Sequence, residues 1–244
     1  MRVHLFVPCY VDQFYPRVGI ATLHLLERLG CEVVYPRNQT CCGQPMANSG
    51  AEEAARSTYR HFAEVFAGAE YVVCPSGSCV HHVAAHYDIV EQTSAVTQVR
   101  SAVYELCEFL VDVLGTPALT ARFPHRVGLH QSCHGLRGLR LASDSERVEE
   151  PYSKLLPLLD QVDGLEVVPL DRVDECCGFG GTFAVAQEAL SVRMGRDRIA
   201  DHARHGAEYI VSADMSCLMH LEGLLRRGGS ALGVRHVAEV LVAQ

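Results

Sequence analysis

The sequence carries one cysteine pattern twice, and this duplication restricts the folds open to it. In each copy a single cysteine is followed by an adjacent pair with a glycine, and later by a fourth cysteine. The first copy consists of Cys9, Cys41, Cys42 and Cys79, and the second of Cys133, Cys176, Cys177 and Cys217. The flanking segments repeat too, since RVHLFVPC resembles RVGLHQSC and GAEYVVCPSGSC resembles GAEYIVSADMSC. We therefore expect two similar halves, each with one four-thiol site.

The duplication also separates the eleven cysteines into eight that recur and three that do not. The other half has a different residue at each non-recurring position: Leu165 matches Cys31, Ser212 matches Cys74, and Ala238 matches Cys107. Free cysteine is most often a small buried residue, so we expect these three in the core. Of the three, Cys74 lies nearest to a predicted site.

The chain is long enough to bury a substantial core, with 244 residues of which 48% are hydrophobic and 20% charged. A polar stretch with glycine and proline, residues 115–124, separates the repeats. We place the boundary near residue 120. The sequence thus predicts two cysteine-rich domains, residues 1–120 and 121–244.

Charge and hydropathy exclude several classes of protein. The formal net charge is −8 and there is no basic stripe, so nucleic acid is not an expected partner. No apolar run is long enough to cross a bilayer, and the first residues lack a signal peptide's apolar block. We expect a cytoplasmic protein. In a reducing cytosol, eleven cysteines with two adjacent pairs indicate metal or redox chemistry rather than a disulfide framework.

Strand-like and helix-like segments alternate in both halves. Strands are expected at 3–7, 32–35 and 71–73, and again at 127–130, 166–168 and 209–211. The longer helices are expected at 19–29, 51–66 and 184–203. The pattern predicts an α/β fold of two pseudo-repeated Rossmann-like units with parallel sheets.

Every recurring cysteine falls where a predicted strand ends and a helix follows. The cysteine sites are therefore expected at the carboxyl ends of the strands, which form the binding edge of a parallel sheet. Helix starts present free N–H groups that stabilise thiolates. Gly43 and Gly178 follow the adjacent cysteines, where a glycine can turn the chain sharply and leave its N–H near sulfur.

Four thiolates suit either zinc or an iron–sulfur cluster, because both favour sulfur in a tetrahedral arrangement about each metal. Structural zinc sites are usually built from Cys-x-x-Cys pairs, and this chain has none. Two adjacent cysteines can bind different irons of one wide cluster more easily than they can share one zinc. The spacing therefore favours iron–sulfur clusters.

The doubled order of Cys, Cys-Cys-Gly and a terminal cysteine resembles the cysteine-rich CCG domain over essentially the whole chain. Paired CCG domains occur in one of the subunits of heterodisulfide reductase, in the glycolate oxidase iron–sulfur subunit and in lactate utilization protein A. A free-standing chain with CPSGSC in one half and DMSC in the other is most similar to the lactate utilization protein A and YkgE family. The resemblance implies oxidation of L-lactate, or a similar 2-hydroxy acid, with lactate utilization proteins B and C as partners.

The chain departs from the family pattern at two positions. The family's terminal Cys-x-x-Cys would begin at Ser76 and at Asp214, so each half keeps four of five family thiols. Five cysteines hold a non-cubane cluster in heterodisulfide reductase, whereas four imply an ordinary [4Fe–4S] cluster, one per half. Asp214 could bind iron through an oxygen, or cap a helix, since aspartate before an apolar run is a common N-cap. Cys74 could replace the missing ligand in the first half.

Histidines and arginines also lie near the predicted sites. His82 and His220 each follow a site cysteine by three residues and could donate hydrogen bonds to sulfur. Arg137 and Arg140 could hold a carboxylate, but balancing the thiolate charge or facing solvent is the simpler role. The remaining histidines beside the sites are expected to be structural: His81, His130 and His134.

The residues and the resemblance together predict an iron–sulfur subunit of an oxidoreductase complex that passes electrons from the oxidation of lactate to pyruvate. The eight recurring cysteines are the predicted ligands, with Asp214 as a further cofactor-binding residue. No catalytic residue is assigned, because no flavin or nicotinamide site is evident and the hydride chemistry then belongs to a partner. Two alternatives stay open: a thiol–disulfide redox subunit like heterodisulfide reductase, and a non-catalytic protein with two structural zinc sites.

Overall fold

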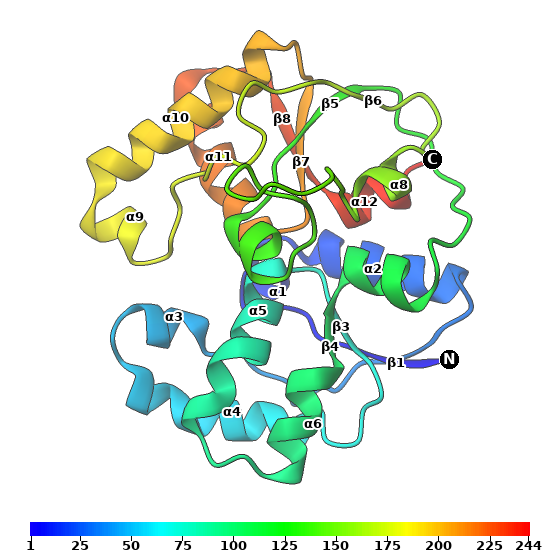
Figure 1. Ribbon diagram of the computed structural model, residues 1–244, viewed down its shortest axis with the longest axis vertical. Coiled ribbons are helices and arrows are strands. Elements are labelled where there is room, and N and C mark those ends of the chain that lie inside the picture. Colours follow the sequence, from blue (N-terminus) through cyan, green and yellow to red (C-terminus); the bar gives the residue numbers. More distant parts are fainter.

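The chain folds into two lobes, and the computed structural model describes all 244 residues (Figure 1). Each lobe is built on a four-stranded sheet in which every neighbouring pair is parallel. The first sheet has the order β2-β1-β3-β4 and the second has the same order, β6-β5-β7-β8. The predicted fold class, two pseudo-repeated Rossmann-like α/β units, is confirmed.

The strands are short and occupy equivalent places in the two halves. In the first half they are β1 (Arg2–Leu5), β2 (Glu32–Val34), β3 (Val72–Cys74) and β4 (Val103–Glu105). In the second they are β5 (Arg126–Leu129), β6 (Glu166–Val167), β7 (Tyr209–Ser212) and β8 (Gly233–His236).

Helices connect the strands and cover the sheets. The first half contains α1 (Cys9–Phe14), α2 (Pro16–Arg28), α3 (Gln44–Asn48), α4 (Glu52–Val65), α5 (Gly77–His86), η1 (Tyr87–Ile89), α6 (Ser94–Ala102), α7 (Leu106–Glu108) and η2 (Phe109–Val113). The second contains η3 (His134–Gly138), α8 (Leu156–Leu159), α9 (Phe183–Ala186), α10 (Glu188–Arg204), α11 (Met215–Gly228) and α12 (Val237–Leu241). None of these helices combines the length and the apolar character needed to span a bilayer.

The structure differs from the predicted elements in two ways. The fourth strand of each sheet was not expected, because β4 and β8 run directly into α7 and α12 and share the helical spacing of those segments. The long helix expected at 184–203 is two helices, α9 and α10, since Gln187 between them has the non-helical angles φ −127° and ψ 48°.

The two lobes share one hydrophobic core. Leu25 and Leu110 of the first half and Leu129 and Leu158 of the second belong to the same set of 25 buried residues. Helix α2 of the first half packs against α12 of the second, as Figure 1 shows near the middle of the molecule. The division near residue 120 falls between η2 and β5 and stays a prediction.

Two ion pairs also connect the halves. Arg17 on α2 pairs with Glu239 on α12 across 2.8 Å, and Lys154 of the second half pairs with Glu108 of the first across 3.4 Å. The two glutamates follow β8 and β4 at matching positions. The halves therefore contact each other with pseudo-two-fold symmetry.

Two non-recurring cysteines lie in the shared core as predicted. Cys107 is fully buried and Cys31 is nearly so. Cys74 is also buried, but in the apolar core of the first lobe beside the predicted site.

The side chain that ends each fourth strand caps the following helix. Glu105 accepts hydrogen bonds from the N–H groups of Cys107 and Glu108, at 2.7 and 3.2 Å. His236 Nδ1 accepts from the N–H of Ala238 at 3.1 Å. Burial raises the pKa of Glu105 to about 8.

The raised pKa of Glu105 predicts a pH dependence of stability. Between about pH 6 and pH 8 the folded chain keeps a proton on Glu105 that the unfolded chain has lost, so stability falls as pH rises. We expect the slope to be about 1 kcal/mol per pH unit, and Glu105→Gln to remove most of it. Denaturant unfolding of both proteins across this range measures the difference, and equal slopes would contradict it.

Candidate metal centres

The recurring cysteines lie where the strands of each sheet end. Cys9 begins α1 after β1, and Cys133 precedes η3 after β5. Cys79 and Cys217 occupy the first turns of α5 and α11. The adjacent pairs lie in the loops that follow β2 and β6. The placement of the cysteines at the carboxyl ends of the strands is confirmed.

The four thiols of the first half lie close to one another. Cys9 Sγ is 3.6 Å from Cys41 Sγ. The Cys42 thiol interacts with those of Cys41 and Cys79. Cys42 and Cys79 are buried, whereas Cys9 and Cys41 are partly exposed. Cys74 also interacts with Cys79, so a fifth thiol adjoins the first site.

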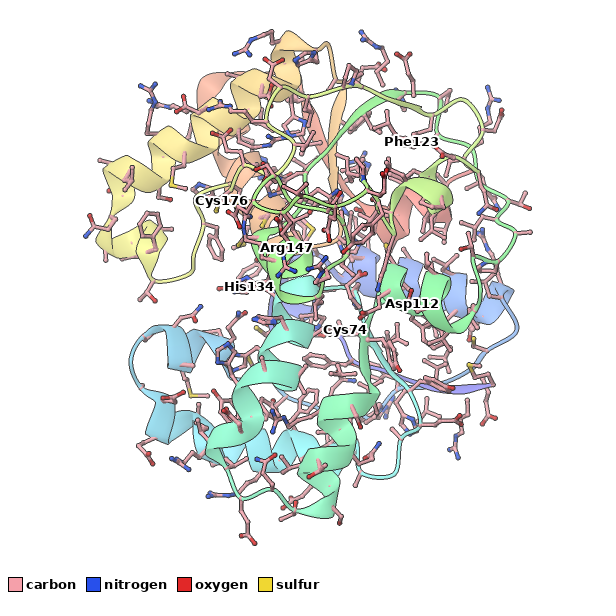
Figure 2. The ribbon with its side chains drawn as sticks, in the orientation of Figure 1. Cys74, Asp112, Phe123, His134, Arg147 and Cys176 are labelled. Carbon is pink, nitrogen blue, oxygen red and sulfur yellow. The ribbon has the colours of Figure 1, made fainter.

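The second half brings together the equivalent four thiols. Cys176 interacts with Cys133 and Cys177, and Cys177 interacts in turn with Cys217. Cys177 and Cys217 form a buried inner pair, and Cys133 and Cys176 a partly exposed outer pair. Cys133 Sγ lies 3.8 Å from His134 Nδ1, and Figure 2 shows His134 and Cys176 near the junction of the lobes.

Interactions among the thiols lower the pKa of Cys41 and Cys79 in the first half and of Cys176 in the second, and so favour the thiolate form. Interactions with Cys42 and then Cys9 lower the pKa of Cys41 to about 3. In the second half, Cys133 and then Cys177 lower the pKa of Cys176 to about 2. The pKa values of Cys42 and Cys177 are raised instead, because each donates its proton to neighbouring sulfurs and is also buried. A cation bound among the sulfurs would release these shared protons, because metals bind thiolates.

A glycine shapes the loop at both sites. Gly43 and Gly178 have φ angles of 88° and 86°, in the left-handed region. Their N–H groups lie 3.3 and 3.4 Å from the Sγ atoms of Cys41 and Cys176. The prediction that these glycines turn the chain and direct an N–H at sulfur is confirmed.

Asp214 joins the two halves at the start of two helices. It is the N-cap of α11, where Oδ1 accepts from the Ser216 N–H at 3.1 Å and from its hydroxyl at 2.6 Å. Oδ2 accepts from the Ser78 N–H at the start of α5, at 2.8 Å. Ser76 forms an isolated backbone bridge with Asp214 and caps α5 in the same way. Both positions that lack the family cysteine therefore meet at the pseudo-two-fold axis.

The histidines expected to donate to sulfur have other partners at Nε2. His82 Nε2 lies 2.9 Å from the Tyr59 hydroxyl. His220 Nε2 lies 3.4 Å from the Ser191 carbonyl oxygen. A Cβ added at Gly43 would meet Tyr59, and one added at Gly178 would meet Ser191. Each histidine therefore contacts the residue that packs against the glycine of its site.

Arg137 and Arg140 pair with acidic residues of the chain itself. Arg137 contacts Glu146 at 2.9 Å and Asp174 at 3.6 Å, and Arg140 contacts Glu149 at 2.6 Å. Both lie at the surface, in agreement with the simpler of the two predicted roles.

His130 belongs to the second site, although its sequence position suggested a structural role. The side chain is 1% exposed and neither ring nitrogen has a hydrogen-bond partner. A ring nitrogen and the Sγ atoms of Cys177 and Cys217 all lie within 4.8 Å of one another. Burial and then the charge of Arg198 lower the pKa of His130 to about 3, so the imidazole is neutral. The sequence did offer one sign that His130 is unusual. When RVHLFVPC is aligned with RVGLHQSC, His130 matches Phe6 of the other half.

A cavity of about 390 Å³ opens onto the second site. Its wall includes Tyr10 and Asn48 of the first half together with Cys133, Cys176 and Cys217 of the second. No cysteine of the first site lines it. This cavity therefore adjoins the cysteines of the second site and not those of the first.

Comparison with known proteins agrees with this duplicated architecture. The chain matches the CCG cysteine-rich domain in two segments, residues 3–84 and 127–222. It is 40% identical to lactate utilization protein A 1 of Bacillus mycoides (strain KBAB4), over 99% of this chain and 96% of that protein. It is 43% identical to lactate utilization protein A of Exiguobacterium sp. (strain ATCC BAA-1283 / AT1b), over 98% and 96%.

A solved structure shares the fold. A hypothetical protein from Helicobacter pylori superposes with a TM-score of 0.58 at 11% identity. The match covers 98% of this chain and 48% of that one, so this chain spans about half its length. Two matched CCG segments and full-length relatives above 30% identity lead to one conclusion: the chain belongs to the CCG cysteine-rich family that includes lactate utilization protein A.

Proposed function

We propose that this protein is the iron–sulfur subunit of a cytoplasmic oxidoreductase system that oxidises L-lactate to pyruvate. The observation that carries this proposal is the pair of equivalent four-thiol groups at the carboxyl ends of two parallel sheets. The names of the full-length relatives support lactate as the substrate of the system. Lactate utilization proteins B and C, or an equivalent redox complex, are the proposed partners.

The residues at both sites fit an iron–sulfur cluster. Each site offers four thiols, of which the inner pair is shielded from solvent and the outer pair is partly open. The N–H groups of Gly43 and Gly178 add donors to sulfur. Two cysteines of each site also lie at or near the start of a helix, where free N–H groups stabilise thiolates. A bound cluster would accept and pass on single electrons. The chain's own residues hold the sulfurs in place and keep the inner ligands dry.

The site geometry also favours a wide cluster over a single zinc ion. Cys9 and Cys79 of the first site come from separate strand ends, and adjacent Cys41 and Cys42 lie between them. Adjacent cysteines can reach two irons of a cluster, but one small tetrahedral ion uses paired Cys-x-x-Cys segments more readily. The proposed ligands are therefore the recurring cysteines: Cys9, Cys41, Cys42 and Cys79 in one half, Cys133, Cys176, Cys177 and Cys217 in the other.

Replacement of Asp214 tests whether the second site needs a fifth ligand. Both carboxylate oxygens already accept N–H groups, so we expect Asp214→Asn to keep the iron content of the reconstituted protein. Loss of charge at two helix starts should lower the free energy of unfolding by about 1 kcal/mol. Iron and sulfide analysis with denaturant unfolding measures both effects. We expect Cys217→Ser, which removes a proposed ligand, to lose half the iron. The same loss in Asp214→Asn would instead show that Asp214 is a ligand.

Electron transfer from lactate is the direct test of the function. The anaerobically reconstituted protein would be mixed with lactate utilization proteins B and C, and its visible absorption followed after addition of L-lactate. We expect bleaching that depends on the partners and on L-lactate, with D-lactate as the control. Full cluster content without any bleaching in the complete system would contradict the proposed role.

The cavity supports a second candidate, a thiol–disulfide redox subunit. A disulfide or thiol of the cavity's size could contact the outer cysteines of the second site, Cys133 and Cys176. A new spectroscopic signal from oxidised protein on addition of a thiol would favour this role. The same spectrum with and without thiol would count against it.

A further inference from the structure

One residue behind the inner thiols has a different character in the two sites. In the second half this residue is His130, directly after β5. Its counterpart in the first half is Phe6, directly after β1. Both side chains are buried, at 1% and 0% exposure. The duplication therefore provides an internal comparison of the same position with and without a polar group.

Phe6 packs against other aromatic side chains. Its ring packs edge-on against Phe62 at 4.8 Å and against Phe66 at 5.9 Å between centroids. All three side chains belong to the core of the first lobe, with Cys42 and Cys79 in the same core. The Phe6 ring itself has no N–H or O–H that could be donated to the inner sulfurs of the first site.

The surroundings of His130 are polar and charged. On α10, Arg198 is fully buried and its Nε lies 3.1 Å from His202 Nε2. Arg198 Nη1 contacts Asp201 at 3.2 Å, while Nη2 has no partner. A neutral imidazole has one N–H donor and one lone pair, and the charge of Arg198 opposes a second proton on the ring. The single N–H is therefore free to point at a neighbouring sulfur within 4.8 Å.

We propose that His130 donates a ring N–H to the inner thiolates of Cys177 and Cys217 and makes the second cluster easier to reduce than the first. This inference rests on the proposed iron–sulfur function. Reduction adds negative charge that spreads onto the ligand sulfurs, and a donor aimed at them stabilises that form. The buried Arg198 charge acts in the same direction. A buried imidazole with both nitrogens unpartnered is costly, and an N–H turned toward a sulfur within 4.8 Å would satisfy one of them.

The two clusters would then work in a fixed order. Electrons would collect on the second cluster, which is also the one that the cavity reaches. The first site, lined by aromatic residues and closed to the cavity, would be the relay. An electron acceptor would therefore be met at the second site.

Replacement of His130 tests the order. The His130→Phe variant copies the first half, and His130→Gln is the matched control because its amide keeps an N–H donor. Redox titration of the reconstituted proteins, followed by electron paramagnetic resonance, gives the two midpoint potentials. We expect His130→Phe to lower the midpoint potential of the second site by about 59 mV for a one-electron couple, which is a tenfold shift in the redox equilibrium between the sites. His130→Gln should keep most of the wild-type potential. Where His130→Phe gives no folded protein, His130→Leu takes its place.

Three results would overturn the inference. Unchanged potentials in His130→Phe would show that the histidine does not act on the cluster. An equal shift in His130→Gln would remove the hydrogen bond as the cause. Loss of half the iron in His130→Phe, with none restored by glutamine, would make His130 a ligand rather than a donor. If wild-type protein binds no iron and sulfide at all, the proposed function itself fails.

Discussion

The Cys177→Ser variant should lose one cluster and keep the other. Cys177 lies at the centre of the second thiol group, where it interacts with Cys176 and Cys217 and is buried from solvent. Serine cannot supply a comparable ligand to iron, because its hydroxyl stays protonated at neutral pH. We expect iron and sulfide per chain to fall by about half after anaerobic reconstitution. The equivalent variant Cys42→Ser should halve them through the first site.

Cys107→Ser is the matched control for this experiment. Cys107 is fully buried but belongs to the shared apolar core, away from both thiol groups. A buried hydroxyl without a partner should lower the free energy of unfolding by about 1–3 kcal/mol and leave the metal content unchanged. Cys31→Ser should behave in the same direction. Equal loss of iron in all four variants would contradict the division between ligand and core cysteines.

Gly178→Ala should damage the second site through the backbone. The residue has φ 86°, and an added Cβ would lie 2.7 Å from the Ser191 carbonyl oxygen and 2.8 Å from Met194 Cβ. The left-handed conformation and the collision with α10 together should cost about 3 kcal/mol or more. Any relaxation also moves the N–H away from Cys176 Sγ. Denaturant unfolding and iron analysis should therefore both report a loss.

Gly50→Ala separates the two causes. Gly50 has a similar φ of 77°, but an added Cβ there meets nothing within 4 Å. We expect a loss of about 1 kcal/mol and normal iron content, which is the cost of conformation alone. If Gly178→Ala were no worse than Gly50→Ala in both measurements, the close packing of the Cys-Cys-Gly loop would have no structural role.

The duplication made most of the fold predictable. Matching segments around Cys9 and Cys133 identified the first strand of each sheet, and the GAEY segments before Cys79 and Cys217 identified the third. Alternation between strands and helices then predicted the parallel sheets. These features depend on local pattern and on repetition, which a single sequence displays directly.

The missed features depend on contacts between distant segments. β4 is three residues long and joins α7 without a break, so local spacing did not separate it from the helix. The carboxylate of Asp214 reaches Ser78 in the other half, a contact that no local pattern encodes. A sequence predicts a helix cap at Asp214, but not that one carboxylate serves two helices.

His130 shows the same limit at the site. In sequence it is one of several histidines near a cysteine, and only its mismatch with the other half sets it apart. Only the fold buries the ring without a hydrogen-bond partner and brings it within 4.8 Å of the Sγ atoms of Cys177 and Cys217. The mismatch with Phe6 was visible in the repeat, and a difference between duplicated halves is therefore a useful signal of functional divergence.

Iron and acid-labile sulfide per chain, measured after anaerobic purification or reconstitution, test the central claim most directly. The proposed function predicts about four irons and four sulfides at each site, or about eight of each per chain. A broad visible absorption that bleaches on reduction should accompany them. Tightly bound zinc at about two ions per chain, without sulfide and without visible colour, would contradict the iron–sulfur assignment and leave two structural zinc sites.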